Sequence, residues 1–331
     1  MSFPLPRRRA LLALPALAAP MLIGFRASAQ AINLRSADIH PDGYPTVEGV
    51  KILAKLAKER SNGRINIQVF HSRQLGEEKD TLEQTRFGVL DMNRTNFAGL
   101  NNLVPETVIP GLPFLFRDEA HMHSVMDGQI GQEILAGAER HGLVGLCCYD
   151  SGARSMYNRL RPINQLSDMR GMKIRVQQSD LWLAMMRALG ANATPLPTGE
   201  VYSALQTGVI DGAENNYPTY QSQRHFEVSK FYSITEHSMS PEILLMSKRS
   251  YDRLPREMQT VLRESARDSV PEMRRLWVAR SEAARREVVA AGATINTVDK
   301  AAFEQAMAPV YDQFVRDERL KAMVRRIRET A

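Results

Sequence analysis

The chain has 331 residues, enough for two domains of ordinary size, each with its own hydrophobic core. Hydrophobic residues make up 44% and charged residues 24%, a balance typical of a globular protein that excludes a disordered or predominantly membrane-embedded chain. The net charge of +6 falls to +2 without the four arginines of the first 29 residues, and no basic cluster elsewhere is interleaved with aromatic residues, so no nucleic-acid partner is predicted.

The first 29 residues have the features of a secretory signal peptide. Residues 7–9 are three arginines, and the apolar run ALLALPALAAPMLIGF follows. Residues 27–29, Ala-Ser-Ala, fit the small-residue rule of a cleavage site, so we predict export with cleavage near Ala29. A membrane anchor is the alternative, but prolines interrupt the run and it is shorter than the roughly 20 residues that a spanning helix needs. The RRRALL start leaves both the Sec and the twin-arginine routes open.

Strand and helix patterns alternate through most of the chain that follows. The strand patterns are AINLRSADI, RINIQVF, LDMNRT, GLVGLCCY, KIRV and FYSITEH, and the helical ones include PTVEGVKILAKLAKERSNG, GEEKDTLEQTRFG, GQEILAGAERHG and GEVYSALQTG. This alternation predicts largely parallel sheets with helices on both faces. No Pro/Gly/Ser-rich linker separates two lobes, so we expect the chain to cross between them more than once, near residues 148–154 and 236–242.

Cys147 and Cys148 are the only cysteines. Neighbours on a strand point to opposite faces, so a disulfide between them would be strained. We expect two small buried or half-buried residues, with neither a disulfide framework nor a zinc site.

Long helical patterns dominate the last eighty residues or so. Apolar residues recur at helical spacing from Pro255 to Ala290, where Pro271 should kink the helix or begin a second one. A final helix is predicted from Lys300 to Arg328. Helices of this length after an α/β body suggest elements that brace two lobes.

No enzyme or metal signature stands out along the chain. The motifs G-x-S-x-G, H-E-x-x-H, G-x-x-x-x-G-K-[ST] and G-x-G-x-x-G are all absent. His121 and His123 lie two apart on a predicted helix, where side chains do not share a face, so we predict no metal site. A general acid/base pair among the remaining histidines and carboxylates is left open, because nothing in their order singles one out.

The stretch GMKIRVQQSD, residues 171–180, suggests anion recognition. Its alternation predicts a strand that ends near Arg175, followed by Gln177 and Gln178, either of which could add amide contacts. The helix that comes next would point its positive N-terminus toward the same place, which favours an anion. Ligands of open α/β sheets collect at the carboxyl ends of the strands, and an arginine can meet a carboxylate with two parallel hydrogen bonds. A solvated strand face is the alternative interpretation.

A second polar cluster lies at other predicted strand and loop ends. SGARSMYN places Arg154 after the first expected crossing, and GVIDGAENNYP places Glu214, Asn215 and Asn216 in a turn. Two arginines and an asparagine in such positions are typical of a carboxylate clamp. The sequence alone does not show that they converge.

The stretch GMKIRVQQSDLWLAMMRALGANATPLPTGEVYSALQTGVIDGAENNYPTY, continuing through HFEVSKFYSITEHSM, resembles the solute-binding proteins of TRAP (tripartite ATP-independent periplasmic) transporters, the DctP-like family. The resemblance extends from Ala31 to the last helix. It implies an α/β fold with two lobes, a clamshell like that of periplasmic binding proteins, built from mixed, mostly parallel sheets and long C-terminal bracing helices. It further implies a protein that captures an organic acid and delivers it to a membrane permease, with no catalytic activity and no cofactor.

The resemblance also implies roles for single residues. Arg175 matches the arginine that pins the ligand carboxylate, Arg154 a second arginine near the same group, and Asn215 the asparagine of the E-N motif. Further positions that the resemblance places at the cleft are Glu77, His40, Arg94 and Gln178.

Three of these matches carry a qualification. Glu77 matches an acid that accepts hydrogen bonds from ligand hydroxyls in some members, but an acid in the first turn of a helix is equally natural. His237 matches a histidine of the crossing strand that could be structural only. Thr198 stands where many relatives carry an aromatic residue against the ligand, which puts stacking at this position in doubt.

Four short segments resemble those of members associated with hexuronates such as glucuronate and galacturonate: HPDGYPT, RQLGEEK, QQSDLW and ENNYP. A uronate offers one carboxylate for the arginines and several hydroxyls for the other cleft residues. An aldonate or a C4-dicarboxylate is the alternative, and the latter would need a second cation such as Arg94. An exported sugar-acid enzyme and a sensory binding protein are further alternatives.

The predicted domain organisation follows from the expected crossings. We assign residues 1–29 to the signal peptide, residues 30–152 with about 241–280 to lobe I, and residues 153–240 with about 281–331 to lobe II.

Overall fold

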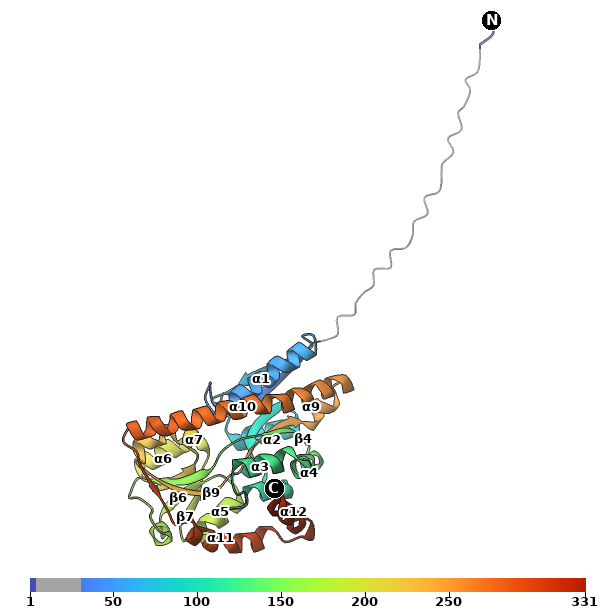
Figure 1. Ribbon diagram of the computed structural model, residues 1–331. Coiled ribbons are helices and arrows are strands. Elements are labelled where there is room, and N and C mark those ends of the chain that lie inside the picture. The colour runs from blue at the N-terminus through green and yellow to red at the C-terminus, as the bar shows by residue number, and fades with distance from the viewer. Residues whose placement is uncertain (4–30) are drawn as a thin grey trace. The chain divides into compact units, whose positions relative to one another are not determined.

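The computed structural model describes residues 1–3 and 31–331, so the predicted signal peptide lies almost wholly outside the described residues. Contacts divide the chain into Met1–Gln30 and a compact unit, Ala31–Ala331, which contains the elements labelled in Figure 1. Among residues 1–3 and 31–331, no helix combines the length and the apolar character that a membrane crossing needs.

The compact unit contains two separate sheets. The first has the strand order β2-β1-β3-β10-β4, with β1 (Ile32–Ala37), β2 (Ile65–Phe70), β3 (Met92–Asn96), β4 (Leu143–Tyr149) and β10 (Glu242–Ser247). The second has the order β11-β9-β5-β8-β6-β7, with β5 (Arg154–Asn158), β6 (Lys173–Val176), β7 (Asn192–Pro195), β8 (Gly212–Asn215), β9 (Phe231–Ser238) and β11 (Thr294–Thr297). We call the first sheet, together with the helices and loops that connect its strands, lobe I. The second sheet, together with the helices and loops that connect its strands, is lobe II.

Both sheets are mixed, and parallel pairs outnumber antiparallel ones. The parallel pairs are β1 with β2 and β3, β6 with β7 and β8, and β9 with β11. The antiparallel pairs all involve β10 or β5, the first strands after two of the three places where the chain changes sheets, the third being the passage from β10 through α10 to β11. The first two crossings are residues 150–153, between β4 and β5, and residues 239–241, between β9 and β10. The predicted fold class, a two-lobed α/β clamshell, is confirmed.

Helices cover the sheets and join their strands. The α-helices are α1 (Pro45–Arg60), α2 (Glu78–Phe87), α3 (Glu119–Asp127), α4 (Gln129–Gly137), α5 (Asp180–Ala188), α6 (Val201–Thr207), α7 (Tyr217–Ser222), α8 (His225–Val228), α9 (Lys248–Asp252), α10 (Arg256–Ala290), α11 (Lys300–Phe314) and α12 (Glu318–Glu329). Short 3₁₀ turns are η1 (Phe97–Leu100), η2 (Pro105–Gly111), η3 (Glu139–His141), η4 (Leu166–Met169) and η5 (Thr198–Glu200).

The long helix α10 braces the two lobes. Its 35 residues span about 50 Å at 1.5 Å per residue. It packs against α1 and β4 of lobe I and against α7 of lobe II, and Figure 1 shows it running past both groups of helices. Pro271 lies inside this one helix and does not begin a second.

The prediction of one final helix from Lys300 to Arg328 is wrong, because the structure has α11 and α12 there. Asp317 separates them: its carboxylate accepts a hydrogen bond from the Leu320 N–H and so caps a new helix. α12 contacts η2 of lobe I. The lobe boundaries given above stay a prediction.

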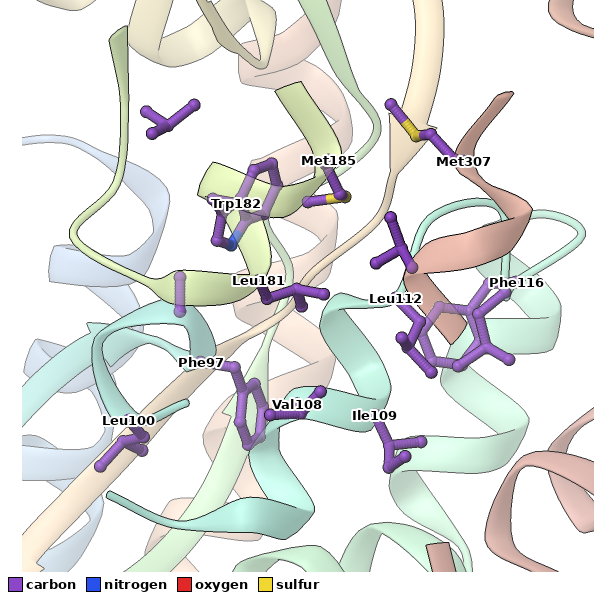
Figure 2. Close-up of a cluster of buried hydrophobic side chains, with 14 of the residues drawn as sticks. Phe97, Leu100, Val108, Ile109, Leu112, Phe116, Leu181, Trp182, Met185 and Met307 are labelled. Atoms are coloured by element: carbon purple, nitrogen blue, oxygen red, sulfur yellow. The ribbon is translucent and has the colours of Figure 1, made fainter. Parts of the chain in front are cut away.

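The hydrophobic core is continuous across the lobe boundary. One cluster contains side chains of η1 and η2 from lobe I together with side chains of α5, β6 and α11, and Figure 2 shows part of it. Cys148 belongs to this cluster, whereas Cys147 belongs to a second cluster between α1, β4 and α10. Both thiols are free and buried on opposite faces of β4, as the sequence predicts.

Candidate ligand-binding cleft

A small chamber lies where the two lobes meet. Residues of lobe I and lobe II both line it: Ile39, His40, Glu78, Arg94, Asn96 and Glu242 on one side, and Arg154, Arg175, Gln177, Thr198, Asn215, Asn216 and Thr219 on the other. Its volume of about 20 Å³ is room for a single water molecule. A second cavity of about 260 Å³ shares Glu78, Arg175, Gln177 and Thr198 with it, so the two form one cleft.

Arg175 brings a buried positive charge into this cleft. The residue is 3% exposed on β6, an interior strand of the second sheet. Its Nε and Nη2 donate to the backbone oxygen of Leu196 at 2.9 and 2.6 Å, and Nη2 lies 3.4 Å from Thr198 Oγ1. Within residues 31–331 no carboxylate forms a salt bridge with it, and its Nη1 has no hydrogen-bond partner there. Burial lowers the pKa of this guanidinium, and the attraction of Glu214 only partly offsets the effect.

Arg154 is neutralised by a partner of its own lobe. Its Nε and Nη2 donate to the two carboxylate oxygens of Glu214 at 2.7 and 2.9 Å, and both residues are buried. Burial opposes the charges, but their attraction outweighs it and raises the pKa of Arg154 while it lowers that of Glu214. Trp182 lies 4.9 Å from this guanidinium, and His237 Nε2 lies 3.5 Å from Glu214. His237 is wholly buried behind the pair.

Arg94 is held by three acids on the lobe I wall. Its Nε donates to Asp38 at 2.8 Å, its Nη2 also donates to Asp38, and its Nη1 donates to Glu242 at 2.7 Å, with Glu78 3.8 Å away. Burial opposes the charge, but Asp38 and Glu242 raise the pKa of Arg94 well above its usual value. Arg94 therefore offers no free charge to a second ligand carboxylate.

His40 and Asn215 line the chamber with polar atoms that are available to a ligand. His40 stacks on Tyr44, with ring centroids 3.8 Å apart, and its Nδ1 is buried without a partner. Burial, and then Arg94, lower the pKa of His40 well below its usual value, so the ring is neutral. Asn215 Oδ1 accepts from the Asn216 N–H at 2.9 Å, which leaves the rest of this amide toward the chamber.

Residues 36–318 match the family described as DctP, bacterial extracellular solute-binding protein, family 7. The chain belongs to this family. Solved TRAP periplasmic solute-binding proteins resemble it over their whole length. One from a Bradyrhizobium species in complex with α/β-D-galacturonate is 55% identical, with a TM-score of 0.89. The match covers 90% of this chain and 100% of the Bradyrhizobium chain.

Two further solved relatives of this DctP-family protein have the same coverage. The one from Xanthobacter autotrophicus, with bound β-D-galacturonate, is 52% identical with a TM-score of 0.89 and covers 90% of this chain and 100% of its own. The one from Roseobacter denitrificans, with bound β-D-glucuronate, is 41% identical with a TM-score of 0.88 and the same 90% and 100% coverage. The predicted resemblance to the TRAP solute-binding proteins is thereby confirmed.

The sequence-predicted residues of this DctP-family protein reach the cleft at different depths. Arg175, Arg154, Arg94, His40 and Asn215 line the inner chamber. Glu77 and Gln178 line only the outer cavity, where Gln178 is exposed to solvent.

Gln177, rather than its neighbour, reaches the chamber. It is 8% exposed, lines both cavities, and its Oε1 is buried without a hydrogen-bond partner. The sequence allows either glutamine to add an amide contact, and the strand alternation favours Gln177, because it shares a face with Arg175 whereas Gln178 does not. Glu78, Asn96 and Glu242 were missed, and no local signal marks them, since only the fold brings them together.

No candidate metal centre is found among the residues that the structure describes. His121 and His123 have separate partners: His121 Nε2 lies 2.8 Å from the backbone oxygen of Ile327, and His123 Nε2 lies 2.9 Å from Asp150. What the DctP-family cleft offers instead is a fixed cation on one wall and hydrogen-bonding groups around it, which suits reversible binding of an organic acid.

Proposed function

We propose that this DctP-family protein captures a hexuronate of the glucuronate or galacturonate type in the periplasm and delivers it to the membrane permease subunits of a TRAP transporter. The observation that carries the proposal is Arg175, a buried guanidinium in the cleft whose Nη1 has no partner within the described residues. A ligand carboxylate would supply the missing negative charge. The solved relatives with bound uronates support the choice of acid.

We assign each predicted residue a part in holding the ligand. Arg175 binds the carboxylate, and the Arg154–Glu214 pair holds the floor of the chamber in place behind it. His40, Asn215 and Gln177 line the chamber and hydrogen-bond the hydroxyls nearest to it. Glu77 and Gln178 contact the part of the sugar in the outer cavity. Arg94 acts indirectly, by holding the acids of the lobe I wall.

The runner-up ligands are less well matched. A C4-dicarboxylate needs a second cation, and Arg94 is already bound to Asp38 and Glu242. An aldonate has one carboxylate and several hydroxyls and differs from a uronate chiefly in being an open chain. We further propose that the protein has no catalytic activity and no cofactor, in keeping with its solute-binding relatives.

A ligand screen tests this proposal. The mature protein is incubated with galacturonate, glucuronate, galactonate and succinate, its melting temperature is measured with each, and the hits are titrated by calorimetry. We expect the uronates to stabilise the protein most, since a ligand bound only by the folded state raises its stability. NMR of the recovered uronate should show it unchanged. Stabilisation by succinate alone, or turnover of the uronate, would contradict the proposal.

A further inference from the structure

The lobe I wall of the cleft carries more acid than base. Asp38, Glu78 and Glu242 surround the single guanidinium of Arg94. The outer cavity adds Lys79, together with Glu77 and Glu83, which pair with Arg73 at 3.6 Å and with Arg86 at 3.3 Å. The net negative charge of this wall therefore lies with the three acids around Arg94.

The inner acids are held in place by hydrogen bonds that use part of their accepting capacity. Glu242 Oε1 accepts from Asn96 Nδ2 at 3.1 Å, and Glu78 Oε1 accepts from the Asn96 N–H at 3.0 Å. Burial raises the pKa of Glu78, the attraction of Arg94 opposes this shift, and the repulsion of Glu242 adds to it. Neutral hydroxyl groups, by contrast, can donate to these carboxylates.

The lobe II wall has the opposite sign. Arg154 and Glu214 cancel one another, so Arg175 is left as the one uncompensated charge among the described residues that line this side of the chamber. The other side chains there are amides and hydroxyls: Gln177, Thr198, Asn215, Asn216 and Thr219. A ligand across the chamber thus meets a cation at one end and carboxylates at the other.

From this opposition of charges we propose that the cleft selects acids with one carboxylate and a hydroxyl-rich far end, and rejects acids with a carboxylate at both ends. Glu78 is the residue that determines this specificity. The inference rests on the proposed function, since it concerns which sugar acids the same cleft accepts. A second carboxylate at the inner end would lie against Glu78 and Glu242, where Arg94 is already paired and Lys79 is exposed in the outer cavity. Like charges brought together in this way are a means of excluding a wrong ligand.

Galacturonate and galactarate provide the test, because galactarate has a second carboxylate in place of the aldehyde end. Competition calorimetry gives the ratio of their dissociation constants for the wild type and for Glu78→Gln. We expect galactarate to bind the wild type about 100-fold more weakly, and the ratio to fall by about tenfold or more in Glu78→Gln. Any difference in affinity between the ring form of galacturonate and the open chain of galactarate cancels, because the same two ligands are compared in each variant.

Asp80→Asn is the matched control. Asp80 lies in the same first turn of α2 and is exposed, and its substitution removes the same charge from the protein as a whole. We expect Asp80→Asn to keep the wild-type ratio. Glu242→Gln serves as a second test variant should melting show Glu78→Gln to be unfolded.

The outcomes separate this inference from the function on which it rests. Binding of galactarate to the wild type within about threefold of galacturonate, less than 1 kcal/mol apart, would overturn the inference and leave the uronate proposal standing. The inference would also be overturned if Glu78→Gln and Glu242→Gln kept the wild-type ratio of dissociation constants, or if neither variant bound galactarate detectably. A change of the ratio in Asp80→Asn equal to that in Glu78→Gln would overturn it too. Failure of the wild type to bind any uronate would instead contradict the proposed function.

Discussion

The two buried arginines of lobe II differ only in their surroundings. Arg154 and Arg175 are both almost wholly buried, yet Arg154 has Glu214 beside it and Arg175 has only a backbone oxygen and a hydroxyl. The sequence predicts that both lie at a binding crevice, and it cannot show which one is already paired. That distinction depends on β5 and β8 being neighbours, with Met156 opposite Glu214.

Removing the acid from this pair should destabilise the fold. In Glu214→Gln the buried guanidinium of Arg154 loses its counter-charge, and we expect the free energy of unfolding to fall by about 3–5 kcal/mol. Urea unfolding measures the change. The control is Glu83→Gln on α2, whose carboxylate pairs with Arg86 and is 41% exposed, and which should cost about 1 kcal/mol or less. Equal effects of the two substitutions would contradict the structural role of the pair.

Buried histidines should make stability depend on pH. Burial lowers the pKa of His225 from 6.5 to about 3. Below pH 6.5 the unfolded chain therefore takes up a proton that the folded chain refuses, so stability is lost as pH falls from 6.5 toward 3. His40 acts in the same direction.

We expect each of these two histidines to lower the free energy of unfolding by about 1 kcal/mol per pH unit in this window. Urea titrations at pH 7, 6 and 5 measure the slope. His225→Gln should reduce it, whereas His71→Gln, a change at a half-buried surface histidine, should reduce it less. A slope that His225→Gln leaves unchanged would refute this explanation.

At the scale of elements, local patterns predict most strands and helices. KIRV is β6 residue for residue, and PTVEGVKILAKLAKER is α1. An error occurs where one residue changes the local geometry, since Asp317 divides the last helix through its side-chain cap. Of the two outcomes predicted at Pro271, a second helix is not formed, because α10 continues through this residue.

Contacts between elements of opposite lobes should help to hold the closed form. Arg73, in the loop before α2, donates from Nη1 to Gln223 Oε1 at the end of α7 at 3.1 Å. Because this bond joins the lobes away from the chamber, its loss should weaken closure without removing a ligand contact. We expect Gln223→Ala to raise the dissociation constant for galacturonate by about fivefold, mostly through faster dissociation.

Stopped-flow measurement of dissociation checks this effect. Gln129→Ala is the control, because Gln129 is an exposed glutamine at the start of α4 in lobe I. An unchanged dissociation rate in Gln223→Ala would show that the contact contributes nothing to closure.

At the scale of the whole compact unit, the chamber is too small for a sugar acid. A volume of about 20 Å³ holds one water molecule, so we expect the lobes to separate when a ligand reaches the chamber from the outer cavity. The sequence predicts the crossings near residues 150–153 and 239–241, but it contains no pattern that reports how far the cleft is closed. Closure results from packing between segments far apart in the chain.

Small-angle X-ray scattering should detect this motion. We expect the radius of gyration of the mature protein to decrease when galacturonate is added, since the ligand favours the closed form. Arg175→Ala with the same concentration of galacturonate should keep the larger radius. A radius that galacturonate does not change would argue against closure around the ligand.

The most direct test of the whole account is calorimetric titration of galacturonate into Arg175→Ala, beside the wild type and Arg187→Ala, a change of an exposed arginine on α5. Loss of one partner of a buried ion pair should weaken binding about 30- to several-thousand-fold. Arg175→Lys should recover only part of the affinity, because an ammonium cannot form two parallel hydrogen bonds to the carboxylate. Wild-type affinity in a folded Arg175→Ala variant would contradict the account.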